Sequence, residues 1–146
     1  MRRTLTTAAL AGLLLAPATA THAGPAKADS TAVKAAIEAF KDAGTRHDTD
    51  AVGALLHDGF RVVFTWTHEP GVTVMDKATY LNLLGAKKIG GSDGTVRFGA
   101  VDVRDELAVA EATIERADAT FRSSFTLIRV DDAWQIVQDA VAVEKK

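Results

Sequence analysis

The chain contains no cysteine, which excludes disulfide bonds, thiol catalysis and cysteine-ligated metal sites. It also lacks a run of basic residues, and its formal net charge at pH 7 is −2. A mildly acidic chain without a basic patch has no positively charged surface that would bind the phosphates of nucleic acid. We therefore expect no nucleic-acid partner, and we expect the fold to be stabilised by burial alone.

The first residues follow the layout of a secretory signal peptide. Two arginines precede an uncharged, mostly apolar stretch at residues 5–16, and small residues then continue to Ala23. Thr21 and Ala23 suit the −3 and −1 positions of a signal peptidase site, and Ala18 and Ala20 offer a second site. The apolar stretch is shorter than the roughly 20 residues that a membrane-spanning helix needs. We expect an exported protein, periplasmic or secreted, with no stable membrane insertion after cleavage.

This interpretation divides the chain into three parts. Residues 1–23 are the expected signal peptide, residues 24–29 a flexible tether, and residues 30–146 a single domain. A domain of that length can bury a sufficient core without covalent links.

Periodicity predicts three helices. Ser30 suits an N-cap, and apolar residues recur at helical spacing after it, namely Val33, Ala36, Ile37 and Phe40. This first helix is expected to run to about residue 46. Asp48 or Asp50 is expected to cap a short second helix, and Asp76 a third.

Alternating apolar residues predict six strands. Phe60, Val62, Phe64 and Trp66 alternate with less apolar residues, and residues 72–75 form a short returning strand. Turn signals at residues 105–106, 117–118 and 131–132 divide the last 50 residues into four more strands. The order α-α-β-β-α-β-β-β-β predicts an α+β fold in which three helices pack on one face of a curved antiparallel sheet.

Three segments carry a resemblance to a known family. They are residues 47–58, which begin His-Asp-Thr-Asp-Ala-Val-Gly-Ala-Leu-Leu, residues 74–81, and the closing segment 122–136 with its Trp-Gln-Ile ending. Their order is similar to that of the NTF2-like superfamily, which includes ketosteroid isomerase, SnoaL-like cyclases and a lumazine-binding-like domain family. One departure is Asp132-Ala133 in place of the usual Asp-Gly turn. The resemblance implies a cone with a pocket between sheet and helices, in a fold that hosts enzymes, binders and assembly modules.

Strand register predicts which side chains reach this pocket. A two-residue turn at residues 131–132 would place Leu127 opposite Ile136 and Phe125 opposite Gln138. Gln138 would then be a polar group among apolar neighbours and would need a hydrogen-bond partner. That partner is either a ligand or an ordinary backbone group or water.

Aromatic residues near one strand end suggest a pocket mouth. If the alternation of the strand continues beyond Phe64, Trp66 and His68 also point inward. Tyr80, the single tyrosine, lies on the buried side of the third predicted helix. An aromatic wall with one titratable group is typical of small-molecule sites, although both aromatics also fit ordinary core packing. The expected ligand-binding residues are Trp66, His68, Tyr80, Phe125 and Gln138.

His68 and Glu69 are the candidates for acid–base catalysis. However, neighbouring residues of a strand point to opposite faces, so both enter one pocket only if the following turn reorients them. The isomerase branch of the superfamily uses a buried tyrosine and two pocket carboxylates. We predict no acid at an inward position of the final hairpin, and we place Asp139 with Arg122 on its outer face as an exposed ion pair.

No metal or cofactor is expected. His47, His57 and His68, with Asp48 and Asp58, lie on separate predicted elements and lack the spacing of a transition-metal site.

These observations favour an exported domain that binds a small apolar or aromatic molecule without catalysis. One alternative is a SnoaL-type or ketosteroid-isomerase-type enzyme with His68 or Glu69 as base. Another is a dimeric assembly module, because a two-fold homodimer through the outer face of the sheet is the default expectation. That face is predicted to mix apolar and polar residues, namely Phe98, Arg104, Leu107, Val109, Glu111 and Thr113.

Overall fold

The computed structural model describes residues 25–146, so the expected signal peptide lies outside the described residues. The elements are α1 (Pro25–Thr45), α2 (Thr49–Leu55), β1 (Leu56–Trp66), β2 (Val72–Asp76), α3 (Lys77–Gly85), β3 (Thr95–Arg104), β4 (Leu107–Glu115), β5 (Ala119–Val130) and β6 (Ala133–Lys145). Their type and order confirm the predicted α+β fold.

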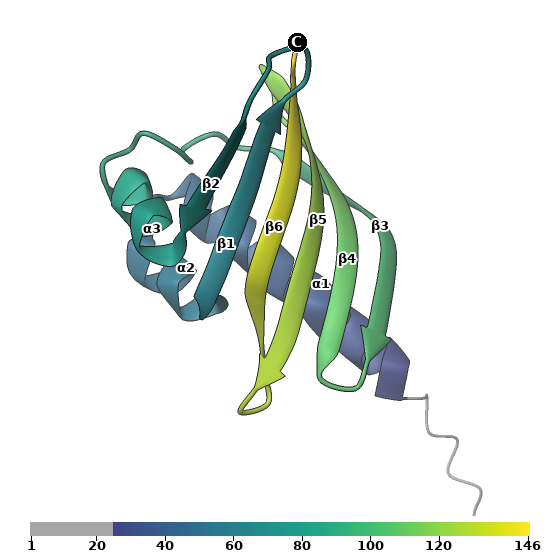
Figure 1. The fold of residues 1–146 in the computed structure, drawn as a ribbon. Coiled ribbons are helices and arrows are strands. Elements are labelled where there is room, and N and C mark those ends of the chain that lie inside the picture. Colours follow the sequence, from purple (N-terminus) through teal and green to yellow (C-terminus); the bar gives the residue numbers. More distant parts are fainter. Residues whose placement is uncertain (1–24) are drawn as a thin grey trace, which may run out of the picture.

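The six strands form one curved sheet in the order β2-β1-β6-β5-β4-β3. Every neighbouring pair is antiparallel except β1 and β6, which run parallel and bring the first strand beside the last. All three helices lie on the same side of this sheet (Figure 1): α1 crosses β3 to β6, while α2 and α3 lie at the β1–β2 side. Within residues 25–146, no helix covers the opposite face of the sheet.

Helix α1 begins at Pro25, so the predicted N-cap at Ser30 is wrong, and most of the predicted tether is helical. Proline is well suited to the first helical position because its missing N–H would have no partner there. Asp29 on this first part of the helix forms an ion pair with Arg129 of β5 at 3.0 Å. The N-terminal end of α1 is thereby fixed to the final hairpin.

The core lies between α1 and the sheet. Val33, Ile37 and Phe40 point from α1 to the sheet and are buried, as the helical spacing predicts. They share one core with the inward residues of β4, the alanines at 108, 110 and 112, which are also buried. These small side chains leave room for the helix above the sheet.

A bulge in β6 changes which residues face the core. Leu127 pairs with Ile136 as predicted, but the next pair is Thr126 with Gln138, so Val137 is an extra residue on β6. An extra residue shifts the alternation by one. Gln138 is consequently exposed on the uncovered face, and Asp139 is buried opposite Phe125. The prediction that Gln138 faces inward is wrong.

A second bulge, in β3, changes which residues of this strand lie on the uncovered face of the sheet. Phe98 pairs with Ala112 and Val101 with Ala110, so two residues of β3 lie opposite one residue of β4 and one of them is extra. Phe98 is half-buried on the helix side, and the centroid of its ring lies 5.6 Å from the ammonium of Lys34. The prediction that Phe98 lies on the outer face is therefore wrong. Leu107 and Val109 are exposed, as predicted.

The predicted caps and turns at three positions are present. Asp48 accepts a hydrogen bond from the Ala51 amide at 3.0 Å, and Asp76 accepts one from the Thr79 amide at 2.8 Å. The turn at residues 131–132 has positive φ at both positions, as a two-residue type I′ turn requires. Among residues 25–146, no helix has the length and apolar character needed to cross a membrane.

Candidate functional site

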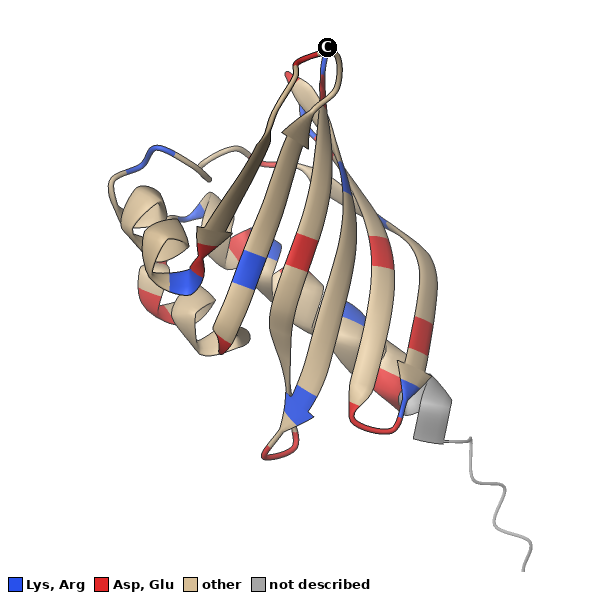
Figure 2. Cartoon of the chain, viewed as in Figure 1, with Lys and Arg blue, Asp and Glu red and all other residues tan. Residues whose placement is uncertain are grey.

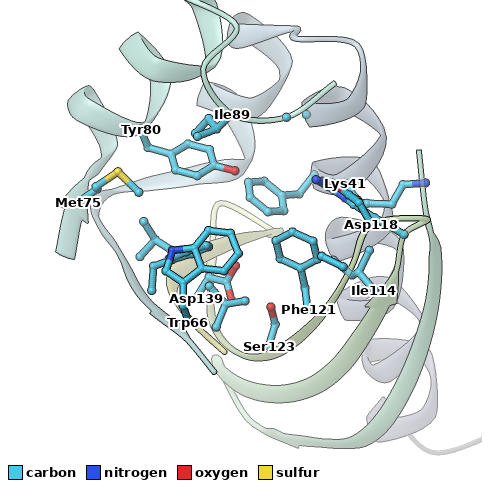
Figure 3. Close-up of a pocket in the computed structure, with 18 of the residues that line it drawn as sticks. Lys41, Trp66, Met75, Tyr80, Ile89, Ile114, Asp118, Phe121, Ser123 and Asp139 are labelled. Atoms are coloured by element: carbon cyan, nitrogen blue, oxygen red, sulfur yellow. The ribbon is translucent and has the colours of Figure 1, made fainter. Parts of the chain in front are cut away.

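A cavity of about 510 Å³ opens between the helices and the helix-covered face of the sheet. Its walls are mainly apolar and come from α1, the segment after α3 and five strands: Phe40, Val62, Phe64, Met75, Ile89, Ile114, Phe121 and Val141. Figure 3 shows Tyr80 and Ile89 on one side of this space, with Ser123 and Asp139 on the other. The cavity is therefore the pocket that the resemblance implied.

Asp139 supplies a carboxyl group to the sheet side of the cavity. Its residue is 8% exposed, and its Oδ1 atom has no hydrogen-bond partner among residues 25–146. Burial raises the pKa of Asp139 to about 7, although a hydrogen bond with the Ser123 hydroxyl opposes this rise. Near neutral pH this carboxyl can therefore gain or lose a proton, and it can donate or accept a hydrogen bond.

Tyr80 approaches from the opposite side of the cavity. Its ring stacks on Phe40 at 6.0 Å and meets Phe60 edge-on at 5.6 Å, so two aromatic contacts fix its orientation. The hydroxyl points into the cavity (Figure 3). Burial, and then the charge of Asp139, raise the pKa of Tyr80 above its usual range, whereas Arg116 lowers it. The phenol remains protonated at neutral pH and is a hydrogen-bond donor.

The cavity mouth combines aromatic rings with cations. Trp66 is 36% exposed at the end of β1, and the ammonium of Lys145 lies 4.7 Å from its ring centroid. The guanidinium of Arg116 lies 4.5 Å from the ring centroid of Phe121. Both are cation–π contacts, which hold positive charge against the aromatic walls.

Of the five residues predicted to bind a ligand, Trp66 and Tyr80 line the cavity. His68 lies outside it, because β1 ends at Trp66 and the chain then turns, with a φ of 72° at His68. Phe125 is fully buried in the core and packs edge-on against Phe40. Gln138 is exposed on the other face of the sheet.

The predicted acid–base pair does not form part of this site. His68 and Glu69 are both exposed in the β1–β2 turn, and Glu69 binds Lys145 at 2.8 Å. The prediction that Asp139 pairs with Arg122 on the outer face is also wrong, since Arg122 binds Glu144 at 3.3 Å. The final hairpin thus does carry an inward acid.

The sequence contains a signal that would have identified Asp139. The apolar residues at the start of β6 have even numbers, Trp134 and Ile136, and those at its end have odd numbers, Val141 and Val143. Such a change of phase within one strand indicates a bulge between the two pairs. Beyond that bulge, Asp139 shares the parity of the buried valines.

Within the described part of the chain, no three His, Asp or Glu side chains gather in a way that could hold a metal ion. His68 in particular is exposed in a turn and has no acidic cluster around it.

Comparison with known families identifies the family to which this chain belongs. Its sequence matches the family described as "Putative lumazine-binding" over residues 28–140. The chain belongs to this family. A comparison with curated protein sequences found no match.

Solved structures show that this member of the "Putative lumazine-binding" family has the NTF2-like fold. An NTF-2 like protein of unknown function from Silicibacter pomeroyi has a TM-score of 0.67 and 16% identity over 80% of this chain and 97% of its own. An NTF2-like protein of unknown function from Shewanella baltica has a TM-score of 0.68 and 12% identity over 80% and 94%. A ketosteroid isomerase-like protein from Erwinia carotovora atroseptica has a TM-score of 0.60 and 18% identity over 79% and 95%.

Proposed function

We propose that this protein binds one small, mainly apolar or aromatic molecule in the cavity between its sheet and helices. The observation that carries the proposal is a cavity of about 510 Å³ with apolar walls and one buried carboxyl, that of Asp139. Small-molecule sites typically measure roughly 300–1,000 Å³ and combine apolar walls with a few polar groups. The family description, lumazine-binding, agrees with a small ligand.

The unpartnered carboxyl oxygen supports the same conclusion. A buried polar atom without a hydrogen bond costs about 1–3 kcal/mol, and Asp139 Oδ1 is such an atom within residues 25–146. A ligand with a polar atom near Asp139 would satisfy this oxygen, while its apolar part would cover the aromatic walls. Ligand binding therefore offsets a cost already present in the fold.

Native mass spectrometry of the protein, purified gently from its own host, tests the proposal. We expect a reproducible extra mass of a few hundred daltons at a stoichiometry of one. Val141→Phe would fill part of the cavity, because Val141 lines it and is buried, and should abolish the extra mass. Ala142→Phe is the matched control, since Ala142 is the next residue of β6 and is exposed on the other face. Equal occupancy in both variants would contradict the proposal.

A second candidate function is proton-transfer catalysis in the same cavity. A general acid or base is most effective when its pKa is close to the working pH, and the pKa of Asp139 is raised to about 7. Tyr80 provides a hydroxyl donor across the cavity. In this function the base is Asp139, because His68 and Glu69 are exposed outside the cavity.

The two functions separate once the bound molecule is recovered. If the protein is an enzyme, incubation with that molecule converts it, Asp139→Asn abolishes the conversion, and His68→Ala leaves it unchanged. If the protein is a binder alone, the molecule is recovered intact after incubation with the wild-type protein.

We also propose that the protein is exported and that it dimerises through the uncovered face of its sheet. Export is supported by the signal-peptide layout of residues 1–23, and detection of the intact N-terminus in the cytosolic fraction would refute it. Dimerisation is supported by exposed Leu107 and Val109 (45% and 43%), and Figure 2 shows that charged residues lie singly along the strands and are of both signs. A monomer by light scattering at tens of micromolar would refute the dimer.

A further inference from the structure

Five cationic side chains line a cavity whose walls are otherwise mainly apolar: Lys41, Lys88, Arg116, Lys145 and Lys146. Three of these cations already bind carboxylates of this chain. The ion pairs are Lys41–Asp42 at 2.8 Å, Lys145–Glu69 at 2.8 Å and Lys146–Glu115 at 3.2 Å. Their charges are therefore partly neutralised before any ligand arrives.

Arg116 is different from these three lysines. Among residues 25–146 its side chain forms no ion pair or hydrogen bond. The guanidinium lies over the ring of Phe121 and acts on Tyr80 through its charge, and its Nε atom is inaccessible to solvent without a hydrogen-bond acceptor. Asp118 lines the same mouth but is exposed and forms no ion pair with Arg116 within this range. Since a guanidinium stays charged at any physiological pH, the mouth holds a fixed positive charge with unused donors.

The backbone around Arg116 is fixed by hydrogen bonds. Its amide donates to the Ala119 carbonyl at 2.9 Å, and its own carbonyl accepts from Lys146 Nζ at 2.6 Å. Stacking on Phe121 then limits where the guanidinium can lie. Because the donors are already oriented, little conformational freedom is lost when an acceptor binds them.

We propose that Arg116 binds an anionic group of the ligand, so that the molecule held in the cavity is an aromatic or apolar anion of the carboxylate type. A carboxylate can accept two parallel hydrogen bonds from a guanidinium. The apolar body then lies against Phe121 and Trp66, and its far end approaches Asp139. This inference rests on the proposed function, because it names the chemistry of the ligand for the same cavity.

Two fluorescent probes with the same aromatic skeleton test the inference. Anilinonaphthalene sulfonate is an anion, and phenylnaphthylamine is its neutral counterpart. We expect the wild-type protein to bind the anion more tightly. Arg116→Gln should raise the Kd of the anion about tenfold or more, as expected for a lost charge-assisted hydrogen bond, and should change the Kd of the neutral probe less than about twofold.

Two further variants control for charge and folding. Arg122→Gln removes an exposed arginine from the uncovered face and should leave both affinities unchanged. Arg116→Lys keeps the charge but loses the paired donors, so it should retain part of the preference for the anion. Binding of the neutral probe by Arg116→Gln verifies that this variant is folded.

The outcomes distinguish this inference from the proposed function. If Arg116→Gln weakens both probes equally, or leaves the anion unaffected, the inference is wrong while the cavity remains a binding site. If neither probe binds the wild-type protein, or if Val141→Phe leaves both affinities unchanged, the proposed function itself fails and the inference fails with it.

Discussion

Replacing Asp139 by asparagine should stabilise the protein at neutral pH, and the gain should depend on pH. The carboxyl has a pKa of 3.8 when it is fully solvated, as in the unfolded chain, and a pKa of about 7 in the folded protein. Between these values the folded state holds a proton that the unfolded state has released. The free energy of unfolding therefore falls as the pH rises from about 4 to about 7, and it is constant above that.

The size of this effect follows from the two pKa values. A rise from 3.8 to about 7 corresponds to at most about 4 kcal/mol of stability lost above pH 7. Asparagine has nearly the same shape and does not ionise, so Asp139→Asn avoids this loss. The variant should match the wild-type protein near pH 4 and exceed its free energy of unfolding by about 2–4 kcal/mol at pH 8.

Urea unfolding from pH 4 to pH 8.5 measures this difference. Hydrogen bonds lower the pKa of three other acids, the exposed Asp58 and Asp76 and the half-buried Glu115. These acids stabilise both proteins above about pH 4 and cancel in the comparison. Asp118→Asn is the control, because it replaces a carboxyl that is exposed at the cavity mouth instead of the buried one, and it should not reproduce the gain in stability. A difference between Asp139→Asn and wild type that is independent of pH would refute the reasoning.

Three further predictions concern the framework of the site. Phe125→Ala should lower the free energy of unfolding by about 3–5 kcal/mol in urea titrations, because a fully buried ring leaves a cavity; an unchanged value would contradict its assignment to the core. Gly90→Ala should lower the thermal midpoint, because its φ is +79° and its Cβ would lie 2.5 Å from the Gly44 carbonyl oxygen; a wild-type midpoint would refute this. Asp76→Ala should lower the free energy of unfolding, measured by calorimetry, by about 1 kcal/mol through loss of the α3 cap. Asp76→Asn should retain most of that stability, because asparagine also caps helices.

Local patterns predicted most of the framework. The helical spacing of Val33, Ile37 and Phe40, the cap at Asp76 and the turn at residues 131–132 depend on neighbouring residues, and the structure contains them all. The start of α1 was wrong because helix propensity extends it to Pro25, and its tertiary anchor is distant in sequence, the Asp29–Arg129 ion pair.

The residues of the site were harder to predict, because the bulge in β6 changes the alternation from which the inward residues were predicted. Strict alternation from Trp134 placed Gln138 inside and Asp139 outside, and the structure has the reverse. Arg116 was missed for a different reason. Its importance depends on the ring beneath it and on the absence of an acceptor within the described chain, neither of which is visible in sequence.

The extra residue at Val137 has a consequence for how insertions and deletions act on binding sites in such chains. The residues on either side of it, Ile136 and Gln138, pair with consecutive residues of β5. Loss of Val137 would therefore make β6 alternate regularly, and Asp139 would stay on the helix-covered face. When relatives are aligned, the residue equivalent to Asp139 should be located by its partner on β5, Phe125, rather than by counting along β6.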